Sequence, residues 1–244
     1  MKGIILGAAT ATAATVAAAA HAGPAVAAIG PLRRRLLPAL AGIGDPHHVA
    51  LTFDDGPHPD ATPEFLRLLD SAQVRATFFL LGRILEEHPK LGEAIVAGGH
   101  EVGVHGYDHR LLLKRSRTAA AADLVRATEA ITRITGVRPH FWRPPYGVAS
   151  TAALLTARRL HLTPVLWTCW GRDWTPTATP DSIHRTVARG LSGGGTILLH
   201  DSDHSAAPRS WEATLEALPG ILTLCRVRGL EVGPLRDHGL TYGS

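Results

Sequence analysis

Short apolar runs alternate with longer amphipathic stretches along most of this chain, and this alternation limits the possible folds more than any other feature of the sequence. Seven runs have the composition of buried strands, at residues 49–53, 76–81, 101–104, 140–142, 164–169, 195–199 and 230–232. The amphipathic stretches lie at residues 62–72, 84–97, 118–134, 150–159, 181–191 and 211–227. Strands separated by helices pair in parallel, as βα units. The pattern predicts one α/β domain, and both a doubly wound sheet and a (β/α) barrel satisfy it.

The composition excludes several classes of protein. The 244 residues are 45% hydrophobic and 19% charged, which is enough apolar surface for a core and too little charge for a disordered chain. Lys and Arg number 25 against 21 Asp and Glu, and outside the N-terminus no basic cluster resembles a nucleic-acid footprint. Cys169 and Cys225 are too few for a disulfide scaffold and are expected to be buried thiols. We therefore expect no nucleic-acid partner. A monomer is also our expectation, although no feature of the composition indicates the oligomeric state.

The N-terminal segment has the pattern of an export leader. No Asp, Glu, Lys or Arg lies between Lys2 and Arg33, and residues 20–22 have the small side chains of a cleavage site. The alternative is an uncleaved membrane anchor at residues 3–22, and the arginines at 33–35 favour retention of that part in the cytoplasm. The pattern therefore predicts a secreted or cell-envelope protein. A membrane-anchored or cytoplasmic form is the alternative if the leader is not processed, and membrane contact is expected only in that case.

The rest of the chain has no linker long enough to divide it into two domains. We assign residues 1–30 to the leader, 31–48 to a lead-in segment, 49–235 to the folded domain and 236–244 to a C-terminal tail. His47 and His48 precede the first strand and are expected at the surface.

Polar residues follow five of the predicted strands. Asp54 and Asp55 follow the first strand, residues 105–109 the third, Arg143 the fourth, Asp173 the fifth, and His200 the sixth. The carboxyl ends of parallel strands face one side of an α/β fold, where active sites lie. Each motif alone has an ordinary explanation as a turn, a cap or a loop histidine. Their joint placement instead predicts one functional site.

The residue types at these ends are those of a metal-dependent hydrolase. His105 and His109 are four residues apart and can present both imidazoles to one ion, and a catalytic zinc needs about three protein ligands. Of the adjacent Asp54 and Asp55, one can complete the ligand set while the other acts as a base. His200 can then protonate a leaving group. This layout predicts hydrolysis of an amide or an ester.

Five motifs resemble those of the polysaccharide deacetylase family, whose members include chitin and peptidoglycan N-acetylglucosamine deacetylases. They are residues 52–57 (TFDDGP), 105–109 (HGYDH), 143–147 (RPPYG), 173–174 (DW) and 198–201 (LLHD). The resemblance covers residues 49–235 and implies that this segment is the catalytic domain. It also implies a distorted (β/α) barrel with about seven parallel strands.

The resemblance assigns a role to each motif residue. It implies that Asp55, His105 and His109 hold a divalent metal, usually zinc, with cobalt or nickel as possibilities. It implies that Asp54 is the catalytic base and that His200 is the general acid.

The remaining motif residues have supporting roles in the family. The resemblance implies that Arg143 pairs with Asp54 and that Asp173 raises the pKa of His200. It implies that the backbone N–H of Tyr146 joins the metal in stabilising the oxyanion. It also implies that the walls of the acetyl pocket are Trp174, Leu198 and Pro145.

Two positions depart from the family pattern. Gly106 stands where the family has Ser or Thr, so the loop has to be held in another way, through Tyr107 or Asp108. Trp170 stands where the family often has an acidic residue. The expected function is removal of acetyl groups from N-acetylated sugars of a chitin- or peptidoglycan-type polysaccharide. An O-acetyl esterase acting on xylan or another glycan and a catalytically silent carbohydrate-binding module are the alternatives.

Overall fold

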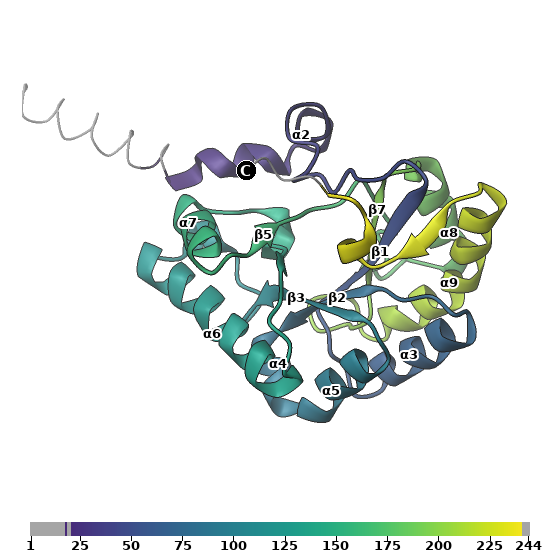
Figure 1. The fold of residues 1–244 in the computed structure, drawn as a ribbon, viewed down its shortest axis with the longest axis horizontal. Helices are drawn as coiled ribbons and strands as arrows, with labels where there is room; N and C mark the ends of the chain where they lie inside the picture. Colours follow the sequence, from purple (N-terminus) through teal and green to yellow (C-terminus); the bar gives the residue numbers. More distant parts are fainter. Residues whose placement is uncertain (1–17, 19–20, 241–244) are drawn as a thin grey trace, which may run out of the picture.

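The computed structural model describes residue 18 and residues 21–240, and in these residues eight strands form one parallel sheet that curls into a distorted (β/α) barrel (Figure 1). The sheet order is β5-β4-β3-β2-β1-β7-β6, and β8 pairs with β1 as well. The strands are β1 (His48–Asp54), β2 (Thr77–Leu81), β3 (Glu101–Gly106), β4 (Phe141–Trp142), β5 (Thr163–Pro164), β6 (Cys169–Trp170), β7 (Thr196–His200) and β8 (Glu231–Gly233). The predicted barrel class and single domain are confirmed.

One predicted strand is wrong in extent. Residues 164–169 form not one strand but the ends of two, β5 and β6, which occupy opposite edges of the sheet. Between them the chain leaves the sheet, and Leu166 N–H donates to Leu40 O of the N-terminal segment (2.8 Å). Among the described residues no ladder joins β5 to β6, so the barrel is open there.

Helices surround the sheet (Figure 1). They are α2 (Gly30–Leu36), α3 (Ala61–Ser71), α4 (Gly82–Glu87), α5 (Pro89–Ala97), α6 (Arg117–Thr135), α7 (Thr151–Arg159), α8 (Pro180–Gly190) and α9 (Ser210–Val227), with short 3₁₀ turns η1 (Gly23–Ala28), η2 (Leu112–Lys114), η3 (Pro145–Gly147) and η4 (Leu235–Asp237). Residues 84–97 divide into α4 and α5 at His88, because the residue before a proline is disfavoured in helical conformation. Thr179 caps α8 in a capping box with Ser182.

The first strand, β1, is rigidly packed and carries Asp54 of the site at its carboxyl end. All seven residues of β1 are buried, and the Phe53 ring lies 5.1 Å from the rings of both Phe65 and Phe78. The register places Asp54 opposite His200 on β7. Because a one-residue slip would turn every side chain of β1 to the other face, this packing fixes where Asp54 points.

The segment before the first strand packs against the barrel. Arg33 of α2 is buried, its guanidinium donates to Trp167 O (2.8 Å), and the Thr196 hydroxyl donates to Gly42 O (2.7 Å). The predicted leader falls largely on residues outside the described part. No helix in the described part is both long and apolar enough to cross a membrane.

The expected surface position of His48 is wrong. His48 is buried in β1, and its Nδ1 lies 2.8 Å from Nδ1 of His238, whose Nε2 lies 3.1 Å from the carbonyls of Gly42 and Gly194. We refer to His48 and His238 as the structural histidine pair. Cys169 and Cys225 are free and buried, as predicted.

Candidate active site

Eight of the eleven predicted site residues line one cavity of about 230 Å³ at the carboxyl ends of the strands. They are Asp54, Asp55, His105, His109, Tyr146, Trp174, Leu198 and His200. Arg143 and Asp173 are buried beside it, in contact with Asp54 and His200. Pro145 is buried in η3 and does not line the cavity. Gly147, Trp167, Trp170 and Ser205 complete the lining.

Asp55, His105 and His109 bring three potential metal ligands together. Their ligand atoms all lie within 4.8 Å of one another, and no other such group occurs in the part of the chain that the structure describes. Nε2 of His105 and of His109 lie 3.2 and 3.3 Å from Oδ1 of Asp55. This oxygen is buried and makes no hydrogen bond. A buried carboxylate oxygen without a donor is costly unless a cation compensates it, so the group fits a metal ion.

The protonation states suit metal binding. Burial opposes the ionisation of Asp55, but the neighbouring histidines His105, His200 and His109 together outweigh it, and the pKa of this carboxyl lies below its usual range. Burial lowers the pKa of His109 to about 4, so this imidazole is neutral. His105 Nδ1 lies 2.9 Å from the Arg143 carbonyl, which can only accept, so Nδ1 carries the proton. The lone pair of His105 therefore lies on Nε2, on the side of Asp55.

Backbone conformation at the site is unusual. Asp55, His109 and Tyr146 all have positive φ, at 73°, 52° and 60°, a region that L-residues rarely adopt. Such residues persist only where the surrounding structure holds them, and they gather at functional sites.

Asp54 is held in position by hydrogen bonding to the buried Arg143. The Arg143 guanidinium donates to Asp54 Oδ1 (2.7 Å), Thr52 Oγ1 (2.8 Å) and Leu166 O (2.9 Å), and it lies over the Phe79 ring at 4.2 Å. The other Asp54 oxygen, Oδ2, is 3.7 Å from His105 Nε2. Asp54 thus stands at the edge of the metal cluster with one oxygen engaged by Arg143.

His200 also lines the cavity and is supported by Asp173. Asp173 accepts from His200 Nδ1 (3.0 Å) and backbone N–H (2.8 Å), and also from Thr214 Oγ1 (3.0 Å). Burial alone would lower the pKa of His200, but the charge and hydrogen bond of Asp173 raise it to about 10. At neutral pH the ring is protonated and can donate into the cavity from Nε2.

A buried acid on α6 holds the loop that follows β3. Tyr107 N–H donates to Asp123 Oδ2 (2.9 Å), and Arg115 donates to Asp123 Oδ1 (2.7 Å). A Cβ at position 106 would lie 3.1 Å from Asp123 Oδ2, and Gly106 has a φ of +106°. Gly106 lacks the side chain that holds this loop in the family. Here Asp123 holds the loop instead, by accepting a hydrogen bond from the Tyr107 backbone N–H.

The departure at Trp170 extends an aromatic wall. Its ring lies 5.8 Å from that of Trp167 and 5.2 Å from that of Trp174, and Trp174 is in turn 5.5 Å from the His200 ring. Trp167 and Trp170 are stacked and the other two contacts are edge-to-face, and a wall of aromatic rings of this kind suits the apolar face of a sugar or an acetyl methyl group.

Three contributors were missed by the sequence analysis: Ser205, whose hydroxyl lies 2.8 Å from His109 Nδ1, Thr214 and Asp123. Thr214 and Asp123 lie within helices and carry no motif signal. Ser205 follows the His200 motif by five residues, so only that proximity could have indicated it.

Comparison with known proteins agrees with this geometry. The family model described as polysaccharide deacetylase matches residues 41–165. A chitooligosaccharide deacetylase of Azorhizobium caulinodans is 33% identical over 196 residues, covering 77% of this chain and 92% of the relative. A peptidoglycan-N-acetylglucosamine deacetylase of Bacillus cereus is 33% identical over 191 residues, covering 78% of this chain and 68% of the relative.

Solved structures show the same fold. A family 4 carbohydrate esterase from Streptomyces lividans, in complex with acetate, matches with a TM-score of 0.69 and 32% identity, covering 78% of this chain and 93% of that one. A family 4 pseudoenzyme from Bacillus anthracis matches with a TM-score of 0.72 and 26% identity, covering 80% and 66%. The chain belongs to the polysaccharide deacetylase family of carbohydrate esterases and is a deacetylase.

Proposed function

We propose that this enzyme removes acetyl groups from N-acetylglucosamine units of a chitin- or peptidoglycan-type polysaccharide, with a divalent metal held by Asp55, His105 and His109. The observation that carries the proposal is the single cavity that this cluster lines together with Asp54 and His200. The names of the Azorhizobium and Bacillus relatives support the substrate class.

One carboxylate and two imidazoles are a typical ligand set for zinc, and cobalt and nickel accept similar ligands. When bound, the metal supplies Lewis-acid activation of the acetyl carbonyl and of the attacking water. The Tyr146 backbone N–H is proposed to donate to the oxyanion that forms on that carbonyl. Tyr146 is held for this role by η3, where Pro145 precedes it.

Proton transfer is assigned to the two flanking residues. Asp54 takes a proton from the attacking water through Oδ2, because Arg143 occupies Oδ1. His200 then donates its proton to the departing amine, and Asp173 keeps the ring charged until that step. The amine and acetate leave, Asp54 then releases its proton to solvent, and His200 takes up a proton from solvent.

The acetyl methyl group is proposed to lie against Leu198 and Trp174. Both line the cavity, together with the rings of Trp167 and Trp170. The pocket is small and apolar on this side, which suits a methyl group and restricts bulkier acyl chains.

Acetate release from N-acetylglucosamine oligomers tests the proposal. The protein is stripped with a chelator, assayed, reloaded with zinc, cobalt or nickel, and its metal content is measured in parallel. Loss and recovery of activity with about one metal per chain supports the proposal. Failure of the reloaded protein to bind metal, or no acetate from any glycan in the panel, overturns the proposal. Either result favours a silent carbohydrate-binding module, and the similar structure from Bacillus anthracis is of a pseudoenzyme.

The same site chemistry serves an ester. Acetylated xylan assayed on the same preparation separates an O-acetyl esterase from an amidase, because only the amide leaves a strongly basic amine that needs the His200 proton. A His200→Asn variant should therefore lose far more activity toward the amide than toward the ester.

Export to the cell envelope is also proposed, from the uncharged segment between Lys2 and Arg33. Fractionation of cells producing the full chain tests this: a product found only in the cytoplasm contradicts it.

A further inference from the structure

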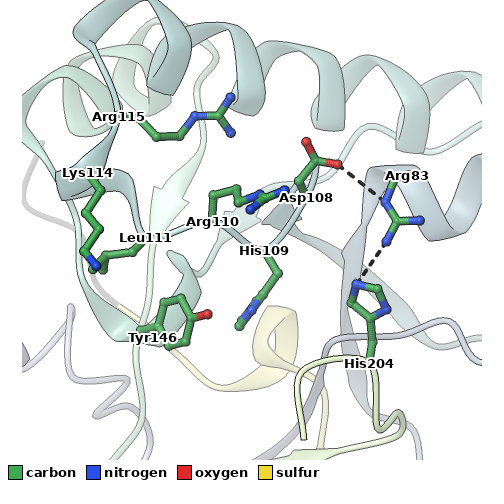
Figure 2. Close-up of a pocket in the computed structure, with 9 residues that line it drawn as sticks. All are labelled: Arg83, Asp108, His109, Arg110, Leu111, Lys114, Arg115, Tyr146 and His204. Carbon is green, nitrogen blue, oxygen red and sulfur yellow. Dashed lines mark hydrogen bonds and ion pairs between the residues drawn. The ribbon is translucent and has the colours of Figure 1, made fainter.

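A second hollow, of about 720 Å³, opens beside the metal cluster (Figure 2). It shares His109 and Tyr146 with the active-site cavity, so the two lie next to each other. The loop that follows β3 forms one wall, and Arg83 of α4 and His204 form the other (Figure 2). We refer to this hollow as the basic cleft. A substituent of a glycan bound at the metal cluster can therefore enter it.

Four of the nine lining residues are cationic, namely Arg83, Arg110, Lys114 and Arg115, and only Asp108 is acidic. The whole chain has 25 Lys and Arg residues against 21 Asp and Glu residues. Positive charge is therefore concentrated here well beyond the average of the protein, in a hollow next to the reaction site.

Two of these cations are tied into the structure. Arg115 is paired with Asp123 (2.7 Å). Arg83 donates to Glu87 (2.8 Å), lies 3.5 Å from Asp108 and contacts His204 (3.1 Å), as the dashed lines in Figure 2 mark for the last two. These pairs hold the walls of the basic cleft together, and their charges are largely compensated.

The other two cations, Arg110 and Lys114, are exposed, and within residues 21–240 neither has a carboxylate within 4.0 Å. Figure 2 shows Lys114 beside Leu111 and Tyr146, with Arg110 between them and Asp108. Cations without partners are free to bind an external anion without first breaking an ion pair.

A further hollow beside the active-site cavity also contains arginines. This hollow, of about 400 Å³, shares Tyr146, Trp167 and Trp170 with the active-site cavity and is lined by Arg33 and Arg34. The Arg33 guanidinium is buried and donates to Trp167 O, whereas Arg34 is exposed and adds positive charge near the active-site cavity, which suits a polymer with repeated negative charge.

We propose that Arg110 and Lys114 bind a carboxylate on the sugar next to the one that is deacetylated. This inference rests on the proposed function and chooses between its two substrate classes. Chitin-type chains are neutral, whereas alternate sugars of peptidoglycan bear a lactyl group that ends in a carboxylate or carries a peptide with carboxylates. The basic cleft therefore makes this enzyme selective for the peptidoglycan-type glycan.

Three tetrasaccharide probes test the proposal. The first alternates N-acetylglucosamine and N-acetylmuramic acid with free lactyl carboxylates, the second is the same glycan with these carboxylates amidated, and the third is neutral chitotetraose. The ratio of kcat/KM for the first probe to that for the second is measured in wild type and in Arg110→Gln/Lys114→Gln. A matched control is Lys90→Gln/Arg189→Gln, which removes the same charge from exposed positions outside the basic cleft and the hollow lined by Arg33 and Arg34.

Wild type is expected to favour the carboxylate probe about tenfold over its amide, and the Arg110/Lys114 variant is expected to lose most of this preference. The control variant should keep it. Equal rates on the two probes in wild type, or an equal loss of preference in the control, overturn the proposal.

A binding measurement separates this proposal from the proposed function. Dissociation constants for the first two probes are measured with Asp54→Asn, whose turnover is expected to be negligible. If wild type deacetylates no glycan but Asp54→Asn still binds the carboxylate probe about tenfold more tightly than its amide, the proposed function fails and the basic cleft stands. If all three probes are deacetylated and the carboxylate makes no difference, the proposed function stands and the basic cleft fails.

Discussion

Two histidine pairs in this protein differ in what their nitrogens face. His105 and His109 direct Nε2 toward Asp55 Oδ1, a buried carboxylate oxygen without a hydrogen bond. In the structural histidine pair, His48 and His238 face each other through Nδ1, and His238 Nε2 faces two backbone carbonyls. Burial of histidines alone therefore does not mark a metal site. A site requires lone pairs converging with a carboxylate, and only the first pair provides this.

The largest expected effect comes from breaking the first pair. His109→Ala removes one of three ligands. Acetate release should fall by roughly a thousandfold or more, because activation by the metal lowers the free-energy barrier of the reaction by several kcal/mol. The structural histidine pair supplies the matched control: His238→Gln should keep activity within about threefold at a temperature where it is folded. Equal losses in the two variants would remove the distinction between the pairs.

A smaller effect is expected from the support of His200. Asp173→Asn removes the carboxylate that raises the pKa of His200 to about 10, so the pKa of the ring falls and the proton donor is lost at lower pH. The rate at neutral pH should fall by about tenfold to a hundredfold, and the alkaline limb of the pH profile should move to lower pH. Thr214→Val, which removes a different contact of Asp173, serves as the control. A profile for Asp173→Asn that is lowered but not displaced contradicts this role.

The structural histidine pair should affect stability instead of chemistry. In His238→Gln the contacts to His48 and to the two carbonyls are disturbed in a fully buried position, and we expect a loss of about 1–3 kcal/mol in the free energy of unfolding. Metal content should be unchanged. Denaturant unfolding checks the first statement, and a loss below about 0.5 kcal/mol would show that the pair does not stabilise the fold.

Acid should weaken the fold through the same pair. Burial lowers the pKa of His238 to about 4 and also lowers that of His48, so both are neutral in the folded chain. An unfolded histidine takes up a proton near its ordinary pKa of about 6.5, so the contribution is complete above that pH and is lost as the pH falls from about 6.5 to 4. Unfolding of metal-free protein at several pH values checks this, and the fall should be smaller in His238→Gln. An identical pH dependence in both proteins is the contradictory result.

Local and nonlocal features differed in how far the sequence could predict them. The strand ends that carry Asp54, His105 and His200 follow from neighbouring residues, and the structure places them as predicted. The division of residues 164–169 depends on the contact of Leu166 with Leu40, more than a hundred residues away. The roles of Asp123 and Thr214 likewise depend on partners in other elements.

The same distinction explains the error at His48. A histidine at the start of a strand gives no local sign of burial, and its partner His238 lies 190 residues further along the chain. For His105 and His109, by contrast, the spacing of four residues was itself the signal.

Metal content measured beside the two histidine variants tests the central claim most directly. Wild type, His109→Ala and His238→Gln are stripped with a chelator, equilibrated with zinc and dialysed, and bound metal is then determined. The account predicts about one zinc per chain in wild type and in His238→Gln, and little or none in His109→Ala. Equal metal content in His109→Ala and wild type, or its loss only in His238→Gln, would contradict the assignment of Asp55, His105 and His109 as the metal site.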